Sequence, residues 1–153
     1  MNNFSDLNDL KKIHATLGEG KVTFDYKGSY ENNLRHGIGS EKLIGTDLTY
    51  SGGWSNGLFH GIGKLFAGES KIEYEGEWSN CYAHGLGTIY REDNRILYKG
   101  HLANNYPHGQ GKSYNEDGNV IYEGRFVNGF LHGFGKEYNE NGVLIYVGVF
   151  LNG

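Results

Sequence analysis

The chain has 153 residues, of which 37% are hydrophobic and 14% aromatic, and it contains 26 glycines but one proline. This aromatic content excludes a low-complexity linker, and the glycines lack the three-residue period of collagen. The net charge of −4 provides no long-range attraction for nucleic acid. The single cysteine, Cys81, excludes an internal disulfide. Because the sequence shows no signal peptide and no run of 18 apolar residues, we expect a soluble, cytoplasmic protein.

Residues 1–25 differ in composition from the rest and are predicted to form an N-terminal cap. Apolar side chains recur there at helical spacing behind Ser5, at Phe4, Leu7, Leu10, Ile13 and Leu17. With Gly18 as a stop, this pattern predicts a short amphipathic helix. Residues 18–24 then resemble half of a repeat. The helix either closes the exposed end of the first hairpin or is a docking segment that fills a groove until a partner displaces it.

From residue 26 onward, one 24-residue unit recurs five times in full and once in part. A tyrosine followed two residues later by glycine marks every copy, and a His-Gly-x-Gly motif follows in the full copies. The tyrosines are Tyr26, Tyr50, Tyr74, Tyr98, Tyr122 and Tyr146, and the histidines are His36, His60, His84, His108 and His132. Because a unit copied at a fixed period packs against its neighbours, we predict one repeat domain over residues 26–153.

Each repeat is predicted to be a β-hairpin. Residues 72–80 alternate between two faces, with Ile72 and Tyr74 on the buried face and Glu73 on the polar one. In the fifth copy the buried face is expected to include Val120. The asparagine that follows each first strand, often with glycine after it, predicts a two-residue turn, because both residues tolerate positive φ.

Successive hairpins must stack, because one hairpin cannot bury its aromatic face alone. We therefore predict an all-β fold, an elongated single-layer antiparallel solenoid of hairpins preceded by the short helix. With strands about 4.8 Å apart, each repeat advances by about 10 Å. The paired glycines of each Gly-x-Gly, such as Gly61 and Gly63, are expected where an aromatic ring crosses the backbone.

The pattern Tyr-x-Gly-x-Trp-x-Asn-Gly, as in residues 50–57, followed by His-Gly-x-Gly, resembles the MORN repeat (membrane occupation and recognition nexus). The resemblance spans residues 26–153, although the unit is one residue longer than usual and Leu102 replaces an aromatic residue. It implies a solenoid that acts without catalysis as a scaffold or adaptor, by laying a partner helix into its groove or by dimerising end to end. It also implies a cytoskeletal or ciliary setting.

Partner binding is predicted for the aromatic columns of the groove. Aromatic side chains are effective anchors for a helix or an extended peptide. The candidate residues are Tyr50, Trp54, Tyr74, Trp78, Tyr98, Tyr122 and Phe126. Core packing is the alternative role, because the same columns must hold neighbouring hairpins together.

The last strand is apolar on the side that is polar in other copies, with Ile145, Val147, Val149 and Leu151 there. A strand that is apolar on both sides needs covering on both sides. Either the natural chain continues or folds back over this strand, or the strand is an association surface. An open strand edge would allow an end-to-end homodimer.

Two further functions stay open. The family name suggests membrane or phosphoinositide association, for which the sequence offers only the sparse lysine column of Lys64, Lys112 and Lys136. Similar arrays also precede kinase or methyltransferase domains, so a regulatory region of a larger protein is the other alternative.

Catalysis, metal binding and cofactors are not expected. Equivalent histidines are about 10 Å apart, whereas the ligands of one zinc ion lie within about 4 Å of each other. No Gly-x-Gly precedes a helix or carries the Gly-Lys-Ser/Thr of a phosphate loop. Acidic residues such as Glu75 and Glu92 do not converge as a general acid and base. Cys81 lies in a predicted turn without an activating partner.

Overall fold

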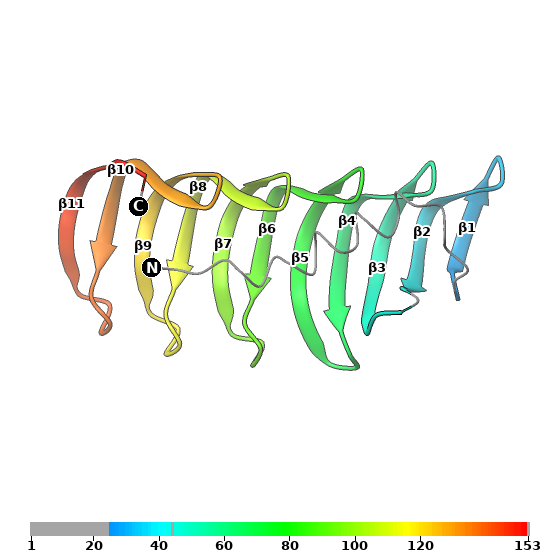
Figure 1. Ribbon diagram of the computed structural model, residues 1–153, viewed down its shortest axis with the longest axis horizontal. Helices are drawn as coiled ribbons and strands as arrows, with labels where there is room; N and C mark the ends of the chain where they lie inside the picture. Colours follow the sequence, from blue (N-terminus) through cyan, green and yellow to red (C-terminus); the bar gives the residue numbers. More distant parts are fainter. Residues whose placement is uncertain (1–24, 44, 153) are drawn as a thin grey trace.

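The computed structural model describes residues 25–43 and 45–152. These residues form one antiparallel sheet of eleven strands, each hydrogen-bonded to its neighbours in sequence (Figure 1). The strands are β1 (Lys27–Glu31), β2 (Leu34–Lys42), β3 (Leu48–Ser55), β4 (Leu58–Ala67), β5 (Lys71–Ser79), β6 (Tyr82–Tyr90), β7 (Ile96–Ala103), β8 (Tyr106–Tyr114), β9 (Val120–Val127), β10 (Phe130–Tyr138) and β11 (Leu144–Phe150). The predicted all-β, single-layer antiparallel solenoid is confirmed.

The predicted N-terminal helix and the half-repeat over residues 18–24 lie outside the described residues. The boundary between a cap over residues 1–25 and a repeat domain over residues 26–153 therefore stays a prediction. Within the described part of the chain, each full repeat contributes two strands, and the partial sixth copy contributes β11.

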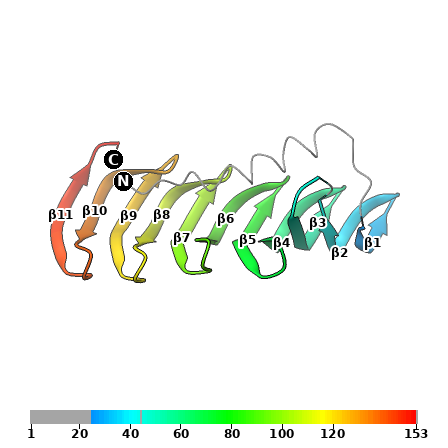
Figure 2. The ribbon, with the colours of Figure 1, turned by 60° about the horizontal axis from the view of Figure 1, so that its bottom comes forward.

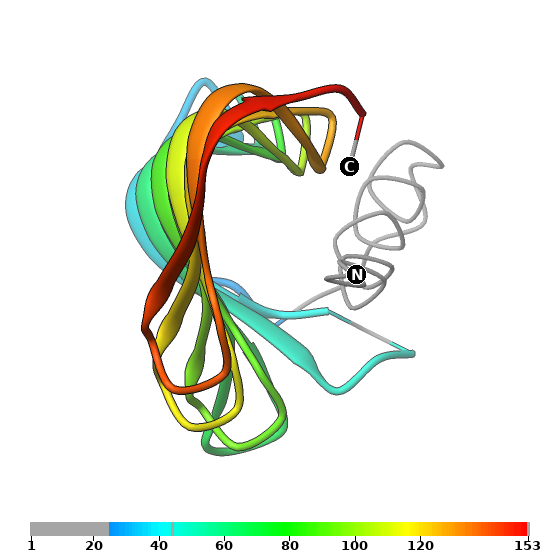
Figure 3. The same ribbon diagram turned by 90° about the vertical axis from the view of Figure 1, so that its left-hand side faces the viewer.

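The sheet is bent into a trough. Figures 1 and 2 show the strands side by side along the long axis, and Figure 3, seen from the β11 end, shows every strand curving in the same direction. Because side chains on the inner side of such a bend converge, we assign the buried residues Tyr50 and Trp54 to that side. We call this side the hollow face. The opposite side, which carries Ile62 and Lys64, is the outer face.

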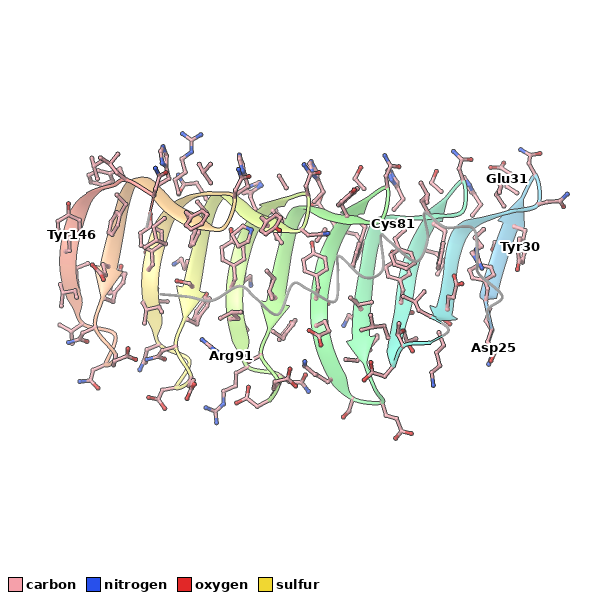
Figure 4. All side chains as sticks on the ribbon, in the orientation of Figure 1. Asp25, Tyr30, Glu31, Cys81, Arg91 and Tyr146 are labelled. Atoms are coloured by element: carbon pink, nitrogen blue, oxygen red, sulfur yellow. The ribbon has the colours of Figure 1, made fainter. Side chains whose placement is uncertain are left out.

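Two kinds of turn occupy opposite rims of the trough, with Cys81 on one rim and Arg91 on the other (Figure 4). The first kind is the predicted two-residue turn, in which both residues have positive φ, as in Asn56 at 51° and Gly57 at 83°. Cys81 adopts the same conformation, with φ at 68°. Its buried Sγ accepts a hydrogen bond from Phe59 N at 3.3 Å, which ties this turn to the preceding hairpin.

The alternation predicted for residues 72–80 is wrong at its start. Tyr74 lies on the hollow face, but Ile72 pairs with Phe66 and therefore lies on the outer face, so that Glu73 is an extra residue in a β-bulge. Glu73 is buried, and its Oε1 lies 2.6 Å from Lys71 Nζ. A polar residue thus occupies the hollow face where the prediction placed an apolar one.

The same bulge recurs at the start of β7, β9 and β11. In the fifth copy, Val120 pairs with Tyr114 and lies on the outer face, not on the buried face with Tyr122 as predicted. A bulge inserts one residue into one strand and so exchanges the faces of the side chains on either side of it.

The tyrosine of each full repeat lies across the glycines of two neighbouring strands, whereas Tyr146 covers Gly148 in its own strand. For Tyr74 these are Gly76 in its own strand and Gly87 in β6, and a Cβ on either glycine would overlap the tyrosine hydroxyl. The hydroxyl donates to the carbonyl oxygen of Glu77 at 2.9 Å. The same bond, from each tyrosine to the residue three positions on, is made by Tyr26, Tyr50, Tyr98, Tyr122 and Tyr146.

The predicted approach of a ring to the Gly-x-Gly motif is therefore confirmed for the second glycine only. The first glycine has another role. Gly61, for example, has a φ of 74° and no atom within 4 Å of an added Cβ, so it is required for its backbone conformation.

We expect Gly87→Ala to destabilise the fold by about 2 to 3 kcal/mol, because the added methyl group displaces the Tyr74 ring. Gly61→Ala is the matched control, and its cost is about 1 kcal/mol, from the positive φ alone. Urea denaturation followed by circular dichroism measures both free energies of unfolding. Equal losses for the two variants would contradict the ring contact.

Candidate partner-binding faces

The seven aromatic residues predicted to line the groove all lie on the hollow face, and all are buried. Their exposed fractions are 0% to 3%. The seven are Tyr50, Trp54, Tyr74, Trp78, Tyr98, Tyr122 and Phe126. This burial favours core packing as their role, and their contact with a partner stays a prediction.

These rings pack edge to face along the trough. The Trp78 ring lies 5.0 Å from the Tyr74 ring and 5.3 Å from the Tyr50 ring, centroid to centroid, and is nearly perpendicular to both. Its indole Nε1 donates to the carbonyl oxygen of Gly63 at 3.1 Å. A similar cluster surrounds Phe126. Each large ring therefore joins two neighbouring hairpins. The edge-to-face arrangement is one that aromatic pairs prefer.

The hollow face is not equally buried along its length. Its central side chains are buried from β3 to β8 and at Tyr122 and Phe126 of β9, but exposure rises at other positions of β9 to β11. Ile121, Leu131 and Glu137 are half-buried, while Tyr146 is 45% and Ile145 58% exposed. The recurring tyrosines and glycines do not predict this change, because they are the same in every copy. The apolar last strand indicates an uncovered end, and the structure shows how far the exposure extends along the hollow face.

The four residues predicted to form a C-terminal association surface are exposed, but they do not share one face. Ile145 is the bulge residue before Tyr146 and lies with it on the hollow face. Val147 and Val149 pair with Lys136 and Phe134 on the outer face, and Leu151 follows the end of β11. The alternation broken by the bulge explains the difference. The role of these residues in association stays a prediction.

A buried charged pair lies on the hollow face near β1. Arg35 Nη2 donates to Glu41 Oε1 at 2.9 Å, and the side chain of Glu41 is fully buried. Within the described residues, Glu41 Oε2 has no hydrogen-bond partner. Burial raises the pKa of Glu41 to about 7, although the positive charge of Arg35 opposes this shift. The guanidinium also lies 5.6 Å from the centroid of the Trp54 ring.

The outer face carries a charged row across the middle of the strands. Lys64 Nζ lies 3.0 Å from Glu75 Oε1, and Lys112 Nζ lies 3.2 Å from Glu123 Oε1. The hydrogen bond from Lys112 lowers the pKa of Glu123. Two of the three lysines predicted to attract lipid therefore have carboxylate partners, which weakens their field at a membrane. Membrane binding stays a prediction.

Two of the repeat histidines make local contacts. The Asn128 backbone N donates to His108 Nδ1 at 3.5 Å, and His36 Nε2 lies 3.4 Å from Glu31 Oε2. Over residues 25–43 and 45–152, no three His, Cys, Asp or Glu side chains are placed to hold a metal ion. Burial raises the pKa of Cys81 to about 11, so its thiol stays protonated at neutral pH. In that same part of the chain, no helix has the length and hydropathy to cross a membrane.

One hairpin recurring in a single open sheet, with the same ring on the same glycines, defines a β-hairpin solenoid. The family model of the MORN repeat matches residues 26–43, 50–68, 74–94, 98–120 and 122–143, together more than half of the chain. The chain therefore belongs to the MORN repeat family, as its motifs predict. Repeats of this kind are consistent with a protein-interaction or membrane-associating module. No curated protein matches the chain significantly.

The sixth, partial copy lies beyond the last matched residue but repeats the tyrosine–glycine contact of the matched copies. The Tyr146 hydroxyl donates to the carbonyl oxygen of Val149 at 3.4 Å. A Cβ on Gly148 would overlap the same ring.

Trp78→Ala should destabilise the protein by about 3 to 5 kcal/mol, because it leaves a cavity among buried rings. Ile62→Ala, which truncates an exposed side chain on the outer face, should cost less than about 1 kcal/mol. Urea denaturation tests the pair. A near-neutral Trp78→Ala would show that this ring is a docking residue and not part of the core.

The raised pKa of Glu41 predicts a pH dependence of stability. Between the ordinary glutamate pKa of 4.5 and about 7, the folded state holds a proton that the unfolded state has lost, so stability falls as pH rises. From pH 5 to pH 8, wild type should lose about 2 to 3 kcal/mol relative to Glu41→Gln. Urea denaturation at both pH values measures this difference. Parallel pH profiles for the two proteins would refute the assignment.

Proposed function

We propose that this protein is a non-enzymatic interaction scaffold that binds an α-helix or an extended peptide of a partner protein on its hollow face. Within the described residues, the sheet is a single layer whose hollow face carries aromatic and aliphatic rows. A helix with its side chains is about 10 Å across and lies naturally along a trough. Membership of the MORN repeat family supports the same class of function.

The observation that carries the proposal is the rise in exposure over β9 to β11. Ile145 and Tyr146 offer apolar surface there, beside the half-buried Ile121 and Leu131, and Glu137 adds a carboxylate. A partner entering at this end would meet accessible side chains, whereas the rings from β3 to β8 hold the hairpins together. The partner-binding residues proposed here are therefore those of the last three strands.

The test compares a hollow-face variant with a matched outer-face variant. Ile145→Glu combined with Glu137→Lys should weaken binding of a protein partner at least tenfold, since it buries a charge and reverses another. Lys27→Glu reverses a charge on an exposed outer-face residue of β1, at the opposite end of the sheet, and should leave affinity within about twofold. Partners are captured from native cell extract with the 153-residue chain, and affinities are measured by calorimetry on purified proteins. Equal affinities for both variants would refute the hollow-face site.

Membrane association is the second candidate, favoured by the exposed Lys136 beside the 66% exposed Phe134 on the outer face. Co-sedimentation with phosphatidylcholine vesicles, with and without phosphoinositide, tests it. If the protein binds vesicles only with phosphoinositide, if Lys136→Glu abolishes this binding, and if no protein partner is captured, the protein is a membrane-associating module and not a scaffold.

A further inference from the structure

The charged row of the outer face is complementary to itself when its order is reversed. Residues paired across neighbouring strands point to the same side of a sheet. Along β4 to β9, the ladder pairs place the following residues in one row: Lys64, Glu75, Thr88, Lys99, Lys112 and Glu123. When the row of a second copy is laid against it in the reverse order, each end places a lysine opposite a glutamate. When the second row runs in the same order, every residue faces its own copy, and like charges meet.

We propose that two copies of this chain pack back to back through their outer faces. The two-fold axis runs parallel to the strands, between β6 and β7. Strand β4 of one copy then faces β9 of the other, and β5 faces β8. Lys64 meets Glu123 of the second copy, and Glu75 meets Lys112 of the second copy. Each ion pair within a chain lies against a pair of opposite orientation, an alternation that favours this register over others.

The neighbouring row, toward the rim that carries Arg91, is apolar and meets the same row of the second copy in this register. Its members pair across the strands as Phe66 with Ile72, Tyr90 with Ile96 and Tyr114 with Val120, and all are half-buried in one copy. In the back-to-back arrangement, Phe66 meets Val120 of the second copy, Ile72 meets Tyr114, and Tyr90 meets Ile96. Burying these half-exposed side chains supplies the apolar contribution to association.

The third row, on the other side of the charged row, adds exposed apolar side chains in the same register. Phe134 is 66% exposed and comes to lie opposite the buried Gly53 of the second copy. Ile38 and Ile62, which flank Gly53 on the outer face, are 73% and 67% exposed. Packing the Phe134 ring against these two isoleucines buries apolar surface on both copies.

The size of the contact indicates a reversible dimer. Because the outer face is convex, contact is confined to the three central rows. The overlap of β2 to β11 is about 48 Å long and three rows are about 14 Å wide, which corresponds to about 650 Å² per copy. Standard interfaces bury about 800 Å² per partner. The dimer would turn both hollow faces outward, and a scaffold with two outward sites gains affinity for partners that are themselves paired.

Sedimentation velocity over a concentration series tests the dimer by charge reversal. Lys112→Glu should weaken dimerisation at least tenfold, because it faces Glu75 of the second copy, and Glu75→Lys should do the same. The double variant restores opposite charges across the interface and should recover most of the affinity. Lys27→Glu, the same change on an exposed residue of β1 that pairs with Ser40, lies beyond the overlap and should have no effect.

Three outcomes would overturn the proposal. The first is a wild-type chain that stays monomeric at all concentrations. The second is a double variant no better than the single ones. The third is a dimer that Ile145→Glu disrupts while Lys112→Glu does not, which would assign association to the end of the sheet. Circular dichroism of each variant shows that the fold is retained. Hollow-face partner binding is measured independently, so failure of the dimer leaves the proposed function standing.

Discussion

A tyrosine ring laid across two glycines is the contact on which the rest of this structure depends. The ring of Tyr50 covers Gly52 and Gly63 on adjacent strands, and its hydroxyl donates to the carbonyl oxygen of Gly53 at 2.8 Å. In a single layer without an opposing sheet among the described residues, the ring supplies apolar contact from within the layer itself. Because it spans two strands and closes one specific hydrogen bond, it also fixes the register of each hairpin.

Because every hairpin has the same register, residues at equivalent positions of successive repeats line up in rows across the strands. Equivalent side chains recur about every 10 Å along the trough, so the character of each face is the sum over all copies. The hollow face collects rings such as Tyr74 and Trp78, which stabilise the sheet. The outer face collects ion pairs such as Lys64 with Glu75, which are exposed and contribute little to stability. Stability and surface chemistry are thus assigned to opposite sides of one layer.

The fold follows from the sequence because its signals are local and repeated. The tyrosine period predicts the stacking, and the asparagine column predicts the turns. The bulge at Glu73 is not predictable in this way, since Ile72 and Tyr74 are compatible with unbroken alternation. Periodicity also assigns a ring to a face without saying how deeply it is buried, so the apolar character of Ile145 indicates an association surface but not the face on which this residue lies. Both features depend on contacts between hairpins, which no single repeat contains.

The order of charges on the outer face shows how a repeat can encode a long-range pattern. Lys64 and Glu75 belong to one hairpin junction, and Lys112 and Glu123 occupy the equivalent junction two repeats later. The intervening junction holds Thr88 and Lys99 and so carries no such pair. The two ion pairs lie on either side of this junction, and a two-fold axis through the junction sets each lysine of the pairs opposite a glutamate of the second copy. Copying alone would have produced the same pair at every junction and no preferred register. The departure from the repeat at Thr88 and Lys99 is therefore the feature that allows two copies to recognise one alignment.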